Sequence, residues 1–149
     1  MNIGVDIVEI KRFNKLYTND KFMNNIFTKE ELDYIKKREN NLSTIAWLYA
    51  AKEAFLKALK FGLDHSLKDI EVYHIDNAPY IRLHNEIKEH CKDMKYDLSI
   101  AHDGLYAIGT VLVFHPWCNN LMLYPNLYTF FAFYDLLTYY IQLIFCQDI

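Results

Sequence analysis

Hydrophobic residues follow a helical period most clearly in the stretch AWLYAAKEAFLKALKFG, Ala46–Gly62. At 100° per residue, Glu53, Lys57 and Lys60 fall on one narrow polar face of this helix. Apolar residues cover most of the remaining circumference: Ile45, Leu48, Tyr49, Ala51, Phe55, Leu56 and Leu59. A helix this apolar is largely buried, so its charged groups are expected to be paired, to bind a metal or to face a cleft. The alternative is an ordinary Glu–Lys pair on a solvated edge, worth about 0.2–0.5 kcal/mol.

The first residues of the chain predict a strand over Ile3–Ile10, which is rich in β-branched residues. Strict alternation separates its residues into two faces: Ile3, Val5 and Ile7 on one, and Gly4, Asp6 and Val8 on the other. Asp6 is thus an acid within an otherwise apolar strand, and it requires a cation or hydrogen-bond donors nearby. The alternative is that the strand stops at Val5 and that Asp6 begins a turn.

Helical signals fill the chain between this strand and the long helix. Lys11, Arg12 and Lys15 lie in a short predicted helix whose apolar residues point inward. A capping box, Thr28 with Glu31, predicts the start of another helix, which is expected to run to about Lys37.

The expected limits of the long helix are Ser43, a suitable N-cap, and Gly62, a natural C′ residue. After it the pattern predicts a hairpin, a short helix and two strands: Asp69–Ile75 with Tyr80–Leu83, then His84–Met94, then Tyr96–Ala101 and Tyr106–Phe114. His102–Leu105 is the expected turn between the last two strands. This order predicts an α+β fold in which a small antiparallel sheet packs with a long central helix, formed by residues 1–115.

Beyond His115 the pattern changes, and residues 116–149 form an apolar C-terminal extension. Its run Leu127–Phe145 spans 19 residues, near the lower limit for a membrane span, but it contains Asp135 and no Lys or Arg flanks it. Three explanations stay open: a membrane or interface anchor, a helix buried against a partner subunit, or a segment not native to the fold. The last includes translation past a frame change.

Composition narrows the function classes. The chain has 149 residues, enough for one domain, and a net charge of −3, which gives no general attraction to nucleic acid. Cys91, Cys118 and Cys146 are far apart and lack metal-site spacing, so we expect free thiols in a reducing compartment. The N-terminus has no signal-peptide pattern. A cytoplasmic location is therefore expected.

Three motifs occur in order along the chain. GVDIVEI at Gly4–Ile10, with Arg12, is similar to a G-[IV]-D-[IL]-x-x-[IV]-x-R strand. AKEA at Ala51–Ala54, with Lys57-Ala58 and Gly62, is similar to an A-K-E-A-x-x-K-A helix. LSIAH at Leu98–His102 is similar to an S-I-S-H segment, and a closing strand follows. By these motifs the chain resembles the holo-[acyl-carrier-protein] synthases, the small trimeric class of the 4′-phosphopantetheinyl transferase superfamily.

The resemblance implies a 4′-phosphopantetheinyl transferase-like fold and a Mg²⁺-dependent activity. The enzyme would transfer the 4′-phosphopantetheine group of coenzyme A to a serine of an apo acyl carrier protein and release adenosine 3′,5′-bisphosphate. It would be a homotrimer with its sites between protomers. The alternative is a non-catalytic module that binds coenzyme A or a carrier protein, tethered to a membrane by the extension.

The resemblance also implies roles for particular residues. Asp6 and Glu53 would be catalytic and hold Mg²⁺, and Glu53 could also orient or deprotonate the serine hydroxyl. Lys57 and His102 would be catalytic and contact coenzyme A. The remaining implied contacts are Lys60 and Gly62 at coenzyme A, and Lys11, Arg12 and Lys15 at the acidic carrier protein.

Three positions depart from the family pattern. Leu48 stands where the family often has Arg, Lys60-Phe61-Gly62 replaces a usual Gly-Thr-Gly, and Ala101 replaces the second Ser of S-I-S-H. We therefore expect one salt bridge of the family to be missing, and a changed coenzyme A loop in which Lys60 supplies a charge.

Overall fold

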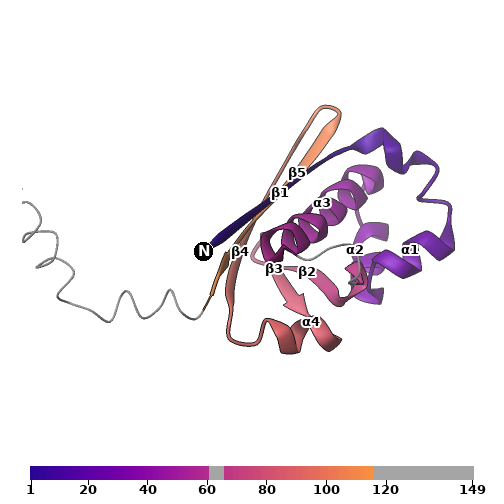
Figure 1. The fold of residues 1–149 in the computed structure, drawn as a ribbon. Helices are drawn as coiled ribbons and strands as arrows, with labels where there is room; N and C mark the ends of the chain where they lie inside the picture. The colour runs from indigo at the N-terminus through magenta and orange to yellow at the C-terminus, as the bar shows by residue number, and fades with distance from the viewer. Residues whose placement is uncertain (61–65, 116–149) are drawn as a thin grey trace, which may run out of the picture. The chain divides into compact units, whose positions relative to one another are not determined.

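The structure is a computed structural model that describes residues 1–60 and 66–115, and Met1–His115 form one compact unit. Its helices and strands follow in this order: β1 (Asn2–Glu9), the 3-10 helix η1 (Ile10–Asn14), α1 (Asp20–Ile26), α2 (Lys29–Lys36), α3 (Asn41–Leu59), the 3-10 helix η2 (Leu67–Asp69), β2 (Ile70–Ile75), β3 (Ala78–Leu83), α4 (Asn85–His90), β4 (Lys95–Asp103) and β5 (Tyr106–Phe114) (Figure 1). The predicted α+β fold is confirmed.

Two antiparallel sheets accompany the long helix α3. One has the strand order β1-β5-β4, and the other is the β2-β3 hairpin. Figure 1 shows α3 lying along β1 and β5. Gly4 and Gly109 permit this close approach, since an added Cβ would stand 1.9 Å from the Ala54 carbonyl oxygen and 2.6 Å from the Ala50 carbonyl, respectively. The backbone of α3 therefore lies almost directly on the sheet.

The alternation predicted for the first strand is confirmed. Gly4 and Val8 are buried against α3, and Asp6 between them is half-buried on the same face. The opposite face is apolar and open, with exposed fractions of 60% for Ile3 and 58% for Ile7. Because β1 continues to Glu9, the alternative that Asp6 begins a turn is wrong.

The cap predictions have mixed outcomes. The capping box at Thr28 and Glu31 is confirmed, with both of its reciprocal hydrogen bonds formed. Ser43 is wrong as the N-cap of α3, because the N-cap is Asn40, three residues earlier, whose side chain accepts the Ser43 N–H at 3.1 Å. The helix also ends before Gly62. Lys60 takes the left-handed cap conformation at φ 59°, and Gly62 lies outside the described residues.

The elements after α3 exist as predicted, with different limits. The hairpin loop is only Asp76-Asn77, whose φ values of 49° and 68° suit a two-residue turn, so Pro79 falls within β3. The helix predicted over His84–Met94 is shorter, ending at His90. His102 and Asp103 belong to β4 and not to a turn, because both pair with β5 and leave only Gly104-Leu105 as the loop.

No helix in residues 1–60 and 66–115 is long and apolar enough to cross a membrane. The apolar run Leu127–Phe145 lies outside the described residues. The extension therefore stays a prediction with its three explanations.

Candidate active site

Asp6 faces α3 and pairs with a lysine of that helix. Its Oδ1 lies 2.7 Å from Nζ of Lys57, and no residue of the described chain donates a hydrogen bond to its buried Oδ2. The Lys57 side chain is 51% exposed, so solvent screens this ion pair. Lys57 thus reaches across to β1, which differs from the predicted alternative of a routine Glu53–Lys57 pair on one helix edge.

Glu53 lies one turn before Lys57 on the same side of α3 and is half-buried. Burial raises the pKa of the Tyr49 hydroxyl, and the charge of Glu53 and a hydrogen bond to it raise that pKa further. The Asp6 charge contributes to the same shift, which places both carboxylates near this hydroxyl. The guanidinium of Arg12 lies 5.7 Å from the centre of the Tyr49 ring. We call Asp6, Glu53 and Lys57 the carboxylate half-site.

His102 lines a separate pocket of about 580 Å³, which we call the His102 pocket. Its wall contains two cations and one carboxylate directly after the end of α2: Lys37, Arg38 and Glu39. It also contains aromatic residues and the start of α3: Tyr34, His74, Ser43, Thr44 and Trp47. A pocket with these cations and aromatic faces suits a ligand that combines a phosphate with a planar ring.

Stacked rings form one side of the His102 pocket. The rings of Tyr34 and His74 are 5.0 Å apart and nearly parallel, and the guanidinium of Arg38 lies 4.7 Å from the Tyr34 ring centre. Burial lowers the pKa of His74, and the nearby charge of Arg38 lowers it further. Burial and the Arg38 charge therefore favour the neutral form of His74 beside the pocket.

The helix α3 separates the two parts. Asp6 on β1 and Ile100 on β4 are both in register with Gly109 on the central strand β5, and Ile100 lines the His102 pocket. The α3 backbone at Ala50 stands over Gly109. Two strand spacings, roughly 10 Å, thus separate Asp6 from the strand of His102, with a helix above the gap. One chain does not bring the predicted catalytic residues together.

Comparison with known proteins identifies the family. A sequence model of the 4′-phosphopantetheinyl transferase superfamily matches residues 2–111. The chain belongs to this superfamily. It is 41% identical over 115 residues to the holo-[acyl-carrier-protein] synthase of Caldicellulosiruptor saccharolyticus, a match that covers 74% of this chain and 94% of that protein.

Solved structures place it with the same synthases. The Helicobacter pylori holo-[acyl-carrier-protein] synthase in complex with coenzyme A has a TM-score of 0.66 at 34% identity, covering 75% of this chain and 99% of that one. The Bacillus anthracis synthase in complex with CoA (3′,5′-ADP) has a TM-score of 0.63 at 32% identity, covering 75% and 94%. The fold predicted from the motifs is that of these synthases.

The remaining predicted residues of this transferase lie outside the carboxylate half-site and the His102 pocket. Lys11, Arg12 and Lys15 are exposed on η1 and at its end. Lys11 pairs with Glu9 at 2.7 Å, and this contact raises the Lys11 pKa. Lys60 is exposed at the end of α3. Leu48, one of the three positions that depart from the expected family pattern, is fully buried in the core.

Sequence reasoning missed most of the His102 pocket. Arg38, His74 and Asn77 are separated along the chain and match none of the three motifs. The one available signal was the pair of cations Lys37-Arg38 directly after the end of α2, where basic residues also favour a helix terminus. Because these two cations are explained by their position at a helix terminus, they did not indicate a pocket.

Proposed function

We propose that this chain transfers the 4′-phosphopantetheine group of coenzyme A to a serine of an apo acyl carrier protein. The observation that carries the proposal is the carboxylate half-site: Asp6 with one free oxygen, Lys57 beside it and Glu53 on the same side of α3. Solved relatives that hold coenzyme A support the substrate. Transfer breaks one P–O bond of the pyrophosphate, forms a serine phosphoester and releases adenosine 3′,5′-bisphosphate.

Each residue of the carboxylate half-site suits one part of this reaction. Glu53 accepts the proton of the serine hydroxyl as that oxygen attacks the phosphorus. Lys57 is half exposed on a flexible stem, so it can exchange Asp6 for a phosphate oxygen as the charge on the leaving group grows. Tyr49 holds Glu53 in orientation through its hydroxyl.

The donor set at Asp6 fits Mg²⁺. Within the described residues no three metal-ligating side chains gather, but this ion is often held by one or two carboxylates together with substrate phosphates. Asp6 offers a buried carboxylate oxygen that lacks a hydrogen-bond partner in the described chain, and Glu53 would supply the second carboxylate. A bound Mg²⁺ would neutralise charge on the pyrophosphate.

The His102 pocket would receive the adenosine end of coenzyme A. Lys37 and Arg38 offer charge to its phosphate, and the aromatic wall of the pocket offers apolar surface for its base. Lys60 and Gly62 stay proposed contacts of coenzyme A. Because α3 lies between the two parts, one coenzyme A would bridge the pocket of one chain and the carboxylate half-site of another.

An apolar sheet face supports the association of chains that such sharing requires, and we propose that the assembly is a homotrimer. Ile3 and Ile7 are exposed on β1, and they are in register with Leu112 and Ile108 on the same face of β5. A continuous apolar face of this kind marks an interface between chains. Three copies that cover it would bring each carboxylate half-site to the His102 pocket of a neighbour.

The cations of η1 are the proposed carrier-docking residues. Lys11, Arg12 and Lys15 are exposed, and Arg12 also contacts Tyr49, next to Glu53. An acidic carrier protein bound there would present its serine to the carboxylate half-site. We further propose a cytoplasmic location, in keeping with the free, buried thiol of Cys91.

Mass spectrometry of the carrier tests the proposed function. Apo acyl carrier protein is incubated with coenzyme A, Mg²⁺ and either the wild-type chain, Glu53→Gln or Glu86→Gln, an isosteric control at an exposed position of α4. We expect modification by the wild type and Glu86→Gln, and at least a hundredfold slower modification by Glu53→Gln, about what loss of a general base removes. Unmodified carrier with the wild type, or equal rates with Glu53→Gln, would contradict it.

A further inference from the structure

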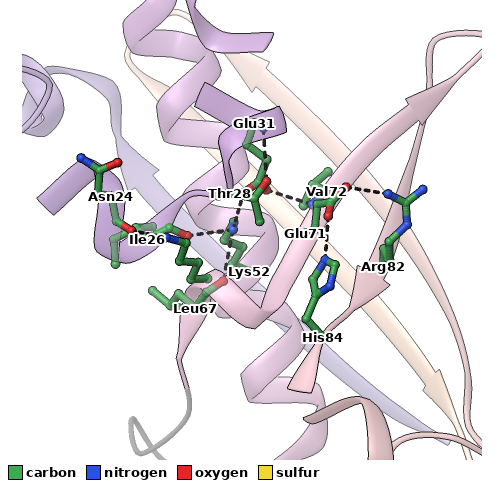
Figure 2. Close-up of polar contacts among 11 residues, drawn as sticks. Asn24, Ile26, Thr28, Glu31, Lys52, Leu67, Glu71, Val72, Arg82 and His84 are labelled. Atoms are coloured by element: carbon green, nitrogen blue, oxygen red, sulfur yellow. Dashed lines mark hydrogen bonds and ion pairs between the residues drawn. The ribbon is translucent and has the colours of Figure 1, made fainter. Parts of the chain in front are cut away.

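A buried ion pair joins the segments that surround α3. The Lys52 and Glu31 side chains are 0% and 1% exposed, with Nζ of Lys52 at 2.7 Å from Oε2 of Glu31. The Lys52 ammonium also donates to the carbonyl oxygens of Ile26 at 2.9 Å and Leu67 at 3.1 Å (Figure 2). All three hydrogens of the ammonium therefore have an acceptor, one each in α1, α2 and η2.

Both carboxylate oxygens of Glu31 also accept hydrogen bonds from backbone N–H groups. Its Oε1 accepts the backbone N–H of Val72 on β2 at 2.9 Å, and its Oε2 accepts that of Thr28 at 2.8 Å (Figure 2). One pair of side chains thus connects α1, α2, α3, η2 and β2. A buried ion pair adds little to the free energy of folding compared with apolar residues of the same volume, so stability alone does not account for this arrangement.

Three of the tethered segments, α2, α3 and β2, carry walls of the His102 pocket. Glu31 lies at the start of α2, and the other end of this short helix carries Lys37 and Arg38. Val72 lies two residues before His74, so both walls of the Tyr34–His74 stack are held by the same carboxylate. Lys52 itself is on α3, directly before Glu53.

We propose that Lys52 and Glu31 are positioning residues that hold the cationic and aromatic walls of the His102 pocket against α3, and so set the affinity for coenzyme A. This inference rests on the proposed function for the identity of the ligand. It requires neither residue to touch coenzyme A. A shift of the walls by about 1 Å is enough to weaken binding strongly, because charged contacts to phosphate depend on geometry.

The test compares Lys52→Met, the double variant Glu31→Leu/Lys52→Met, and the control Arg82→Met. Lys52→Met leaves the Glu31 charge buried alone and is expected to lower Tm, whereas the double variant removes both charges and is expected to recover at least half of that loss. Arg82→Met breaks a 2.9 Å ion pair with Glu71 on the same hairpin without touching α2. Tm, KM for coenzyme A, KM for the carrier and kcat are measured for each.

The double variant should raise KM for coenzyme A about tenfold or more, while kcat at saturating coenzyme A and KM for the carrier stay within about threefold of wild type. Arg82→Met should leave all three constants unchanged. A double variant with recovered Tm and a wild-type KM for coenzyme A would overturn the inference, as would an equal rise for Arg82→Met.

A calorimetric arm separates this inference from the proposed function. The dissociation constant of coenzyme A is measured directly, without carrier protein. If the wild type binds coenzyme A but modifies no carrier, the proposed function fails, and a tenfold weaker binding by the double variant still upholds the inference. Equal binding by wild type and double variant overturns the inference whatever the transfer assay gives.

Discussion

Single residues show what the sequence pattern can and cannot predict. Asp6 was identifiable because alternation placed an acid on the inner face of an apolar strand, where burial demands a partner. The identity of that partner was not identifiable, since Lys57 lies 51 positions away and could equally have paired with Glu53. The place of His74 in the pocket wall was not predictable, because it depends on a ring stack with Tyr34, which lies 40 positions earlier in the sequence.

His74 makes stability depend on pH in a known direction. Its pKa in the folded chain lies below 6.5, so the unfolded chain takes up the proton first as the pH falls. This contribution is fully present above pH 6.5 and is lost as the pH falls through the folded-state pKa. His74→Phe keeps a ring on Tyr34 but cannot titrate, and Tm between pH 7.5 and 5.0 should therefore fall less in this variant. Parallel Tm curves for the two proteins would contradict the assignment.

At the scale of elements, type and order were predictable while several limits were not. The capping box of α2 succeeded because both of its partners lie within one turn of sequence. The start of α3 failed because Asn40, Asn41 and Ser43 are all acceptable caps, and only the tertiary structure selects Asn40. Its end failed because a lysine occupies the left-handed position where glycine is usual.

Replacing Lys60 by glycine should therefore increase the stability of the fold. A non-glycine residue at φ 59° carries strain, part of which is offset by the greater freedom of glycine in the unfolded chain. Lys60→Gly is expected to raise the free energy of unfolding by about 0.5–1 kcal/mol, measured by urea denaturation. Lys60→Ala removes the same charge but keeps the Cβ and should give no such gain. Equal effects of the two substitutions would show that charge, and not backbone conformation, is responsible.

The contact between α3 and the sheet is equally testable. Gly4→Ala would place a Cβ 1.9 Å from the Ala54 carbonyl oxygen, a backbone atom that cannot move alone. We expect a loss of about 3 kcal/mol or more in the free energy of unfolding, the upper range for an overpacked core. Gly104→Ala, whose added Cβ meets nothing within 4 Å, should lose only about 1 kcal/mol through its positive φ. Equal losses would refute the close packing of helix on strand.

At the scale of the whole molecule, the family resemblance implied sites between protomers, but the sequence did not predict which site residues lie on either side of α3. The motifs place Asp6, Glu53 and His102 in one family pattern, but the separation of His102 from the two carboxylates depends on the strand order β1-β5-β4 and on α3 lying over β5. No local pattern encodes that order. The open apolar face of β1 is, by contrast, predictable from the sequence. Alternation puts Ile3, Val5 and Ile7 on the face opposite Gly4 and Val8, so both faces of this strand are apolar.

The central claim is that a working site combines the carboxylate half-site of one chain with the His102 pocket of another. Mixing two inactive variants tests it most directly: Asp6→Asn, and the pocket variant Arg38→Ala/His102→Ala. The two are mixed, dissociated and reassembled together, and transfer to the carrier is followed by mass spectrometry. Size-exclusion chromatography with light scattering confirms that both variants and the mixture form the same oligomer.

When equal amounts of the two variants reassemble at random, about a quarter of the sites combine the intact carboxylate half-site of the pocket variant with the intact His102 pocket of Asp6→Asn. The account predicts that each variant alone modifies little carrier and that the mixture regains roughly a quarter of the wild-type rate. A mixture that forms mixed oligomers yet remains as inactive as its two components would contradict the shared site.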